Sequence, residues 1–228
     1  MPDWQRLRGT FLVLDGGEGC GKSTQARRLA HFFQDDQRLP VVTVRDPGST
    51  AIGEKVRGVL LDPKNTAMAM RCEMLLYMAA RAQMMAEIIR PALARGELVL
   101  CDRFVSSTLA YQLGGDGLTR EEIVGVGDVA VGGERGRWPD LTLIFDMPVE
   151  QSQARVKPKY VPLFKEAGDL PDPSKDRIEQ RPLAYHRQVR ENFLSQAKAM
   201  PARYAVIDAA QTQDEVFAAA LSAVARLL

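Results

Sequence analysis

The residues of this chain best suited to chemistry form a glycine-rich segment, GGEGCGKS, at positions 16–23. It fits GxxxxGK[ST], follows the apolar run FLVLD and opens the amphipathic stretch STQARRLAHFF. Glycines let backbone N–H groups converge on phosphate oxygens, and a helix start adds partial positive charge. Lys22 is expected to contact the β- and γ-phosphates, and the Ser23 hydroxyl suits Mg²⁺, which prefers oxygen ligands. The segment predicts a nucleoside triphosphate site made of Gly16, Gly17, Gly19, Cys20, Gly21, Lys22, Ser23 and Thr24.

A second candidate pair, Asp102 and Arg103, ends the apolar run ELVLCD. The glycine-rich motif alone does not choose among a kinase, a GTPase, a motor ATPase and a nucleotide-gated binding module. The sequence has no NKxD, which GTPases usually carry for guanine, and Arg103 stands where a motor ATPase usually has an acidic residue. A cation beside an aspartate of the magnesium shell favours a second phosphorylated substrate. The pair therefore predicts phosphoryl transfer between two small molecules.

Five short apolar runs without polar alternation must position these residues. Such runs are typical of strands buried on both faces, as in a parallel sheet covered by helices. Four of the five end in Asp, and ligands of open α/β sheets bind at the carboxyl ends of the strands. The predicted strands are Thr10–Asp15, Val41–Arg45, Glu97–Asp102, Leu141–Asp146 and Tyr204–Asp208.

Amphipathic stretches alternate with these runs and predict a βαβ architecture. The fold class we expect is α/β, a five-stranded parallel sheet with helices on both faces and a lid, in one domain over residues 1–228. The predicted helices are Ser23–Gln37, Ala51–Leu61, Ala67–Arg95, Thr119–Val131, Val149–Arg155, Asp176–Met200 and Asp214–Leu228.

Composition excludes several classes of protein. The chain has 228 residues, 46% of them hydrophobic, and a formal net charge of +1. That is a globular composition, and near neutrality argues against binding nucleic acid through bulk charge. Three Cys without a CxxC pair indicate a reducing compartment and neither a disulfide framework nor a zinc site. Neither a membrane span nor a signal peptide is expected, which favours a cytoplasmic protein.

One proline-rich stretch interrupts the alternation. The segment Lys157–Lys175 reads KPKYVPLFKEAGDLPDPSK, and its prolines exclude a continuous helix. Long loops in compact domains are usually functional or disordered. We interpret residues 155–177 as a mobile lid. A solvated insertion without a role is the alternative.

The order of the motifs resembles that of the thymidylate kinase family. Along nearly the whole chain, FLVLDGGEGCGKST is followed by RDPGST, LLYMAARAQ, DRFVSSTLAYQ and DRIE. The pattern DR[FY]xxSxxAYQ together with the phosphate loop is specific for that family. The resemblance implies a P-loop kinase fold and formation of dTDP from dTMP and ATP with Mg²⁺. It also implies a cytoplasmic homodimer.

The resemblance assigns substrate roles to residues in the first half of the chain. Glu18 corresponds to the acidic residue that holds the deoxyribose 3′-hydroxyl, and Arg45 to the arginine near the dTMP phosphate. Asp46 stands where the family commonly has Glu. Tyr77 and Arg81, four apart on one helix face, correspond to the aromatic that stacks on thymine and the arginine that bonds its O4. A solvated carboxylate, a surface ion pair and a core aromatic are the alternatives for Glu18, Arg45 and Tyr77, respectively.

The second specific motif supplies the rest of the site by the same resemblance. Asp102 would orient the waters of Mg²⁺ or the acceptor phosphate, and Arg103 would bind that phosphate. A buried ion pair is the alternative for both. The base and the sugar would be contacted by residues of one short helix, namely Ser107, Thr108, Tyr111 and Gln112.

The cation on the transferred phosphoryl group remains to be assigned. One branch of the family carries an arginine in the phosphate loop, where this chain has Gly19. Transition-state charge still needs a cation. In the other branch the lid supplies an arginine, and Arg155 is the best match, with Arg177 second. Lysines 157, 159, 165 and 175 stand where arginines are usual in the lid, so the catalytic residues we predict are Lys22, Asp102 and Arg155.

A cluster of methionines bears on assembly. Six of the nine lie between Met68 and Met85, and Met74, Met78 and Met85 share a helix face, which favours core or subunit packing. The partners we expect are dTMP, ATP and a second copy of the chain, without nucleic acid or membrane. Another nucleoside monophosphate kinase and a catalytically weak nucleotide-gated binding protein remain as alternatives.

Overall fold

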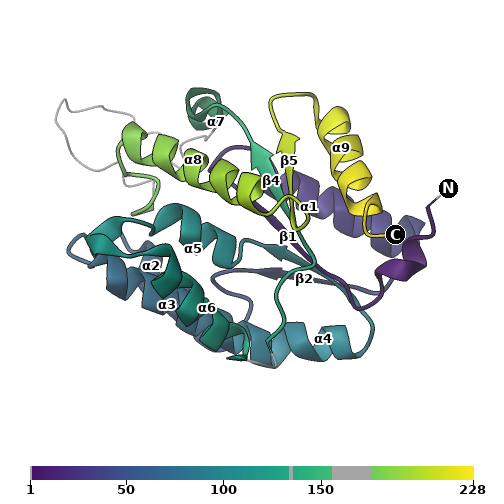
Figure 1. Cartoon of the computed structure of the whole chain (residues 1–228), viewed down its shortest axis with the longest axis horizontal. Helices are drawn as coiled ribbons and strands as arrows, with labels where there is room; N and C mark the ends of the chain where they lie inside the picture. The colour runs from purple at the N-terminus through teal and green to yellow at the C-terminus, as the bar shows by residue number, and fades with distance from the viewer. Residues whose placement is uncertain (1, 134–135, 156–175) are drawn as a thin grey trace, which may run out of the picture.

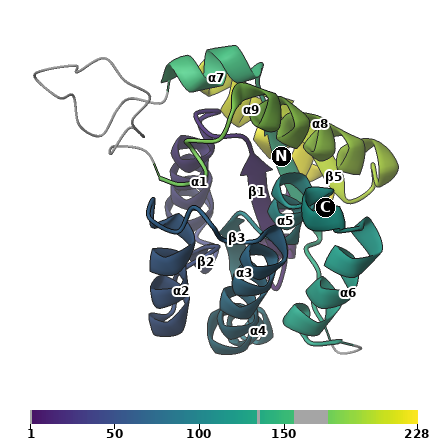
Figure 2. The same ribbon diagram turned by 90° about the vertical axis from the view of Figure 1, so that its left-hand side faces the viewer.

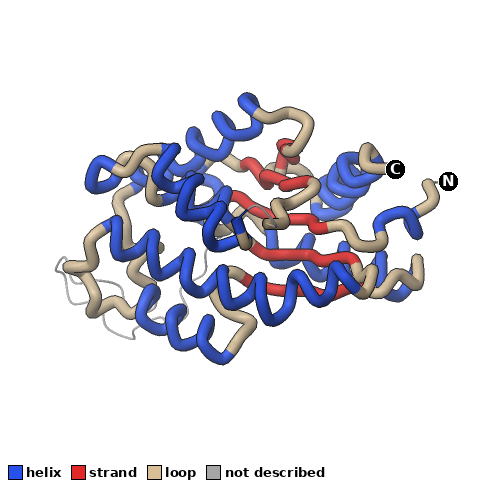
Figure 3. Tube along the Cα trace, turned by 60° about the horizontal axis from the view of Figure 1, so that its bottom comes forward, coloured by secondary structure: helices blue, strands red, loops and turns tan. Residues whose placement is uncertain are grey.

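The computed structural model describes residues 2–133, 136–155 and 176–228 of the chain. Its centre is a five-stranded sheet in which every pair of neighbouring strands is parallel. The strand order is β2 (Val41–Arg45), β3 (Leu98–Asp102), β1 (Phe11–Gly16), β4 (Leu141–Asp146) and β5 (Tyr204–Asp208). Figure 3 shows these strands side by side among the helices. The prediction of a five-stranded parallel α/β sheet is confirmed.

Helices cover both faces of this sheet because alternate residues of each strand point to opposite sides. In β1, Leu12 and Leu14 belong to one apolar core, and Phe11 and Val13 belong to the other. Figure 2 shows α1 and α5 on opposite sides of β1. In chain order the helices are α1 (Lys22–His31), α2 (Ala51–Leu61), α3 (Met70–Met84), α4 (Arg90–Ala94), α5 (Val105–Tyr111), α6 (Arg120–Val131), α7 (Val149–Arg155), α8 (Leu183–Ala199) and α9 (Gln213–Ala225) (Figure 1).

Strand register brings the candidate residues to one edge of the sheet. Asp102 at the end of β3 lies beside Leu14 of β1 on one side and Arg45 of β2 on the other. Gly16 at the end of β1 pairs with Phe145 of β4. Because all strands are parallel, their carboxyl ends meet there, and the loops that follow β1, β2 and β3 form one surface.

Two predicted helices differ from the structure at proline. The helix expected over 176–200 begins only at Leu183, since residues 177–180 form turns and Pro182 is the N-cap. The helix expected over 67–95 begins at Met70 and contains a π-helical turn, Met85–Ile89, before α4. Pro91 at the start of α4 has no N–H for the preceding turn, which accounts for the change in hydrogen bonding.

The methionine cluster is part of the core. Met74, Met78, Met84 and Met85 are all buried and belong to the cluster of buried apolar residues on the α3 side of the sheet. For these four of the six methionines the structure shows core packing, and subunit packing through this region stays a prediction. These side chains fill the space between α3 and the sheet and thereby fix the position of Tyr77 and Arg81 on the same helix.

Candidate active site

The glycine-rich loop joins β1 to α1 and curls around its own lysine. Lys22 Nζ donates to the carbonyl oxygens of Gly16 and Gly17, at 3.2 and 3.0 Å. Gly16 has φ +137°, and a Cβ there would lie 2.4 Å from the carbonyl oxygen of Phe145, so only glycine fits. Gly21 is the left-handed N-cap of α1. The loop therefore holds an ammonium group and the open N-terminus of a helix at one place, as phosphate binding requires.

Ser23 and Asp102 face each other beside this loop. Ser23 Oγ lies 3.4 Å from Asp102 Oδ2, and Asp102 Oδ1 is buried with no hydrogen-bond partner among the described residues. A hydroxyl and a carboxylate with a spare oxygen are suitable ligands for a hard divalent cation that also binds phosphates. In the described part of the chain, no group of three or more His, Cys, Asp or Glu could hold a metal ion unaided. A cation here would need ligands from bound phosphates or water.

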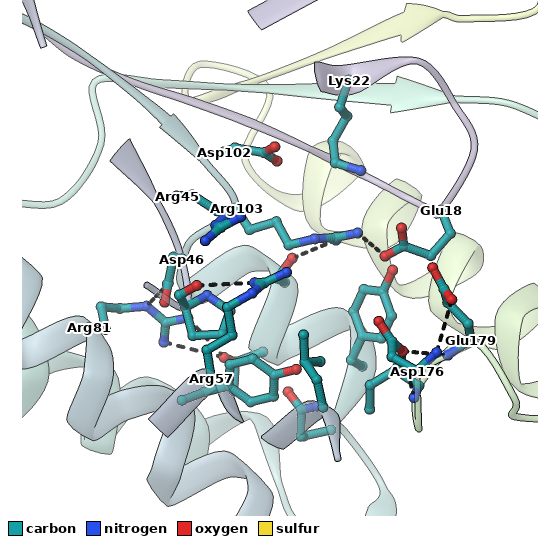
Figure 4. A pocket seen from close by; sticks show the side chains of 18 of the residues that line it. Glu18, Lys22, Arg45, Asp46, Arg57, Arg81, Asp102, Arg103, Asp176 and Glu179 are labelled. Carbon is teal, nitrogen blue, oxygen red and sulfur yellow. Dashed lines mark hydrogen bonds and ion pairs between the residues drawn. The ribbon is translucent and has the colours of Figure 1, made fainter. Parts of the chain in front are cut away.

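Arg103 is the central cation of the site. It follows β3 with φ +72°, a conformation that non-glycine residues rarely adopt. Its guanidinium donates to Glu18, to the Gly16 carbonyl at 3.1 Å and to Ser107 Oγ at 3.1 Å, and it lies 5.2 Å from the centre of the Tyr111 ring. Figure 4 shows Arg103 extending along the cavity toward Glu18. Burial alone would raise the pKa of Glu18, but Arg103 and Lys22 outweigh it and hold that pKa below its usual value.

Asp15, which the sequence analysis did not assign to the site, lies beneath Arg103. It is fully buried, accepts hydrogen bonds from Ser106 Oγ and Ser107 Oγ at 2.7 Å each, and lies 3.5 Å from the Arg103 guanidinium. Burial raises its pKa, against the opposing effect of Arg103. Its place at the end of the first apolar run was a signal for it. Asp15 fixes the start of α5 and the orientation of Arg103 at once.

A buried ion pair forms the opposite end of the site. Arg81 Nε donates to Asp46 Oδ2 at 2.5 Å, and the two Nη atoms of Arg81 lie 3.3 and 3.2 Å from Thr108 Oγ1. The Arg81 and Asp46 side chains are each 1% exposed. Burial raises the pKa of Asp46, although Arg81 opposes the shift. Burial also raises the pKa of Tyr77, which keeps its phenol neutral beside this pair.

Two further arginines line the wall near β2. Arg45 pairs with Glu54 at 3.0 and 3.2 Å, and both side chains are about half exposed. Arg57, which the sequence analysis did not assign, donates to the Pro47 carbonyl at 3.1 Å. Burial and the neighbouring Arg45 lower the pKa of Arg57. With Arg103, these residues give the site three guanidinium groups at one end, and Figure 4 shows all three bordering the same space.

These groups surround one cavity of about 270 Å³. The turn after the undescribed segment also contributes to it, through Asp176, Ile178 and Glu179. Gly16, Gly17 and Cys20 line a smaller neighbouring cavity of about 30 Å³, which shares Glu18 and Tyr111 with the larger one. The sequence-predicted residues that line the larger cavity are Glu18, Lys22, Ser23, Arg45, Tyr77, Arg81, Asp102, Arg103, Ser107, Thr108, Tyr111 and Gln112.

The two lid arginines lie elsewhere. Arg155 is exposed at the end of α7, where its guanidinium lies 3.5 Å from the carbonyl oxygen of Ala209, and it does not line the cavity. Arg177 is buried and donates to Glu73 of α3. Most of the predicted lid, residues 156–175, lies outside the described residues, and all four lid lysines belong to this part. The role of Arg155 stays a prediction.

A phosphate loop between the first strand and helix of a parallel sheet, beside a cavity lined by arginines, is typical of the P-loop kinase class. The family model for thymidylate kinase matches residues 14–220. The chain therefore belongs to the thymidylate kinase family, a group of nucleoside monophosphate kinases. The chain is 45% identical to a thymidylate kinase of Pseudomonas syringae pv. syringae over 210 residues, 92% of each chain. It is 46% identical to one of Pseudomonas putida strain W619 over 206 residues, covering 90% of this chain and 91% of the other.

A solved structure agrees with this assignment. The crystal structure of thymidylate kinase from Ehrlichia chaffeensis superposes with a TM-score of 0.70 at 27% sequence identity. The match covers 94% of this chain and 97% of that one. The similarity therefore extends over the sheet and the helices that carry the cavity, and not only over the phosphate loop.

Proposed function

We propose that this protein transfers the γ-phosphoryl group of ATP to dTMP, giving dTDP and ADP. The observation that carries the proposal is the two-ended cavity. Arg45, Arg57 and Arg103 gather positive charge at one end, while Tyr77 and Arg81 offer an aromatic face and hydrogen-bond donors at the other. A nucleoside monophosphate needs both ends at once, because its phosphate is anionic and its base is flat and uncharged.

The donor nucleotide is assigned to the phosphate loop. The backbone N–H groups of residues 16–24 and the Lys22 ammonium would hold its β- and γ-phosphates. Arg103 would hold the acceptor phosphate in line with the γ-phosphoryl group, and Glu18 would take the sugar hydroxyl. The acceptor is already an anion, so no general base is required, and catalysis reduces to positioning and charge stabilisation.

Magnesium is proposed at Ser23 and Asp102. Their oxygens lie 3.4 Å apart, and Asp102 Oδ1 has no hydrogen-bond partner in the described part of the chain, so both residues are suitable ligands for this ion. When bound, Mg²⁺ would neutralise charge on the donor phosphates. The further cation that the transferred group needs is proposed to be Arg155, in a lid over residues 155–177 of a single kinase domain.

The substrate assignment is tested by a coupled assay with dTMP, dUMP, dCMP, AMP and GMP as acceptors. We expect dTMP to have the highest kcat/KM, by about two orders of magnitude or more over the purine nucleotides, because they cannot fit a site that hydrogen-bonds a single pyrimidine ring. Chelation of Mg²⁺ should abolish turnover. Preference for another acceptor would favour a different nucleoside monophosphate kinase. ATP binding without dTDP formation would favour a nucleotide-gated binding protein.

A homodimer is proposed from the exposed apolar residues of neighbouring helices. Val59 of α2, Leu75 of α3 and Val129 of α6 are 46, 53 and 77% exposed, and α3 packs against both α2 and α6. We propose that these three residues belong to one apolar association surface, because contiguous exposed apolar patches mark protein–protein contacts. We further propose a cytoplasmic location, supported by three cysteines that are free in the structure. No described helix is long and apolar enough to cross a membrane.

Substitution of Val129 by glutamate is expected to shift the protein from dimer to monomer at micromolar concentration, because it places a charge in an apolar interface. Light scattering coupled to size exclusion measures the mass. Val206→Glu is the matched control, since Val206 is 48% exposed on the edge strand β5. A wild-type protein of monomer mass, or equal dissociation by both variants, would contradict the proposed dimer surface.

A further inference from the structure

A fully buried glutamate, Glu73 of α3, connects separate parts of the cavity wall. Its Oε1 accepts a hydrogen bond from Gln112 Nε2 at 2.7 Å. Its Oε2 accepts from Arg177 and, at 2.7 Å, from Arg181. Glu73 itself is 0% exposed and does not line the cavity, whereas Gln112 does. No sequence motif pointed to it, because its partners lie far along the chain.

The bond to Glu73 decides which way the Gln112 amide faces. A carboxylate balanced by two guanidinium groups only accepts hydrogen bonds, so the group directed at it must be the amide NH₂. The amide oxygen, Oε1, is then left for the cavity, and no described residue donates to it. Gln112 therefore offers a hydrogen-bond acceptor to a bound ligand and has no free choice of orientation.

Next to the Gln112 acceptor, the cavity wall offers a hydrogen-bond donor from Arg81. Thr108 lies four residues before Gln112, so the two side chains are adjacent on α5 and its C-cap. Thr108 Oγ1 accepts hydrogen bonds from both Nη atoms of Arg81. A guanidinium group has donors only, and the second N–H of Arg81 Nη2 is not used by these bonds. The wall thus presents an acceptor from Gln112 next to a donor from Arg81.

This donor–acceptor order matches one kind of pyrimidine edge. A ring imide, as in thymine or uracil, has an N–H donor next to a carbonyl acceptor. Cytosine has a ring-nitrogen acceptor next to an amino donor and would be mismatched at both positions. Because leaving a buried polar group without a hydrogen bond costs free energy, this mismatch would weaken the binding of cytosine strongly.

We propose that Glu73 is a positioning residue that fixes the polarity of the base-reading wall and so selects imide pyrimidines over cytosine. It touches no substrate. It acts by holding the Gln112 amide in one orientation, with its own charge balanced by Arg177 and Arg181. The inference rests on the proposed assignment of this end of the cavity to the base of dTMP.

The test is the isosteric variant Glu73→Gln, with calorimetric Kd and steady-state kcat/KM measured for dTMP and dCMP. A glutamine at 73 can present an oxygen or an NH₂, which releases the Gln112 amide to turn. We expect the preference for dTMP over dCMP to fall about tenfold, the effect of one unpaired buried group. Glu87→Gln is the matched control, because Glu87 also accepts from a glutamine, Gln83, at 2.9 Å but is exposed. An unchanged preference in Glu73→Gln would overturn the inference.

A double-mutant cycle separates this role from a structural one. In a Gln112→Ala background, Glu73→Gln is expected to leave the dTMP-to-dCMP ratio unchanged, since there is no amide left to orient. A further fall in the ratio there would overturn the inference. If wild-type protein showed no preference for dTMP, the proposed function itself would fail, and the inference with it.

The wild-type protein provides a measurement independent of the folding of Glu73→Gln. The side-chain amide resonance of Gln112, assigned by its loss in Gln112→Ala, is followed by ¹⁵N NMR during titration with dTMP. We expect the amide proton that is donated to Glu73 to stay hydrogen-bonded there, with little change in shift. A large shift of either amide proton, caused by a new hydrogen bond from the amide NH₂ to the ligand, would overturn the inference.

Discussion

Arg103→Ala is expected to lower kcat/KM for dTMP by roughly three orders of magnitude, the scale of losing a preorganised charge at a phosphoryl-transfer site. In the structure this guanidinium contacts the phosphate loop, Glu18 and Ser107 together. The acceptor phosphate would lose its main cation. Glu18 in the cavity and the buried Asp15 beneath it would also lose the positive charge that balances them. Without Arg103, Glu18 would lose the strongest of the influences that lower its pKa against burial.

The experiment compares Arg103→Ala with Arg103→Lys. Lysine restores the charge but not the planar fork that reaches three acceptors, so only part of the activity should return. Arg95→Ala is the control for loss of a cation elsewhere, since Arg95 is exposed and, among the described residues, forms an ion pair only with Glu97. Thermal unfolding and ATP affinity establish that the variants fold and still bind the donor. Arg103→Ala with kcat/KM within about tenfold of wild type would exclude the central role given to this residue.

The sheet could be predicted closely from the sequence, and the physical reason is burial. Every predicted strand agrees with the structure to within a residue at each end. The central strand, Phe11–Gly16, is buried throughout, so its first four residues are apolar without interruption and its limits are sharp. Helix ends were less predictable. The segment after residue 175 has helical composition, but Pro182 ends its turns and α8 starts only at Leu183.

In the candidate site, residues within specific motifs could be predicted from the sequence, and residues outside them could not. Residues inside specific motifs, such as Lys22 and Arg103, were placed from the sequence because local spacing carries their chemistry. Glu73 and Asp15 were not, since their partners are 104 and 91 residues away and a single sequence gives no sign of such pairs. Both interpretations of Arg45 agree with the structure. It lines the cavity, as its motif implied, and it also forms the surface ion pair that was the alternative, with Glu54.

The buried pair at the base end allows a second large effect, on stability. Arg81→Met is expected to lower the free energy of unfolding by about 3 kcal/mol at neutral pH, because it leaves the Asp46 carboxylate buried without its partner. Asp46 Oδ1 already has no partner among the described residues, so the carboxylate would have none for either oxygen. The variant should also lose most of its affinity for dTMP, since Arg81 supplies the donor of the base-reading wall. Urea denaturation measures the first effect and calorimetry the second.

The pH dependence of this penalty identifies its cause. Burial already raises the pKa of Asp46, and removing Arg81 removes the main opposing influence, so the folded-state pKa should rise further above the unfolded value. A carboxyl group shifted in this direction destabilises the fold as pH increases through that range and is harmless when protonated. The penalty of Arg81→Met should therefore shrink as the pH is lowered from 8 to 5. Arg45→Met removes an exposed pair, and exposed pairs are worth about 0–1 kcal/mol, so a penalty for Arg81→Met in that range at every pH would contradict the buried-charge explanation.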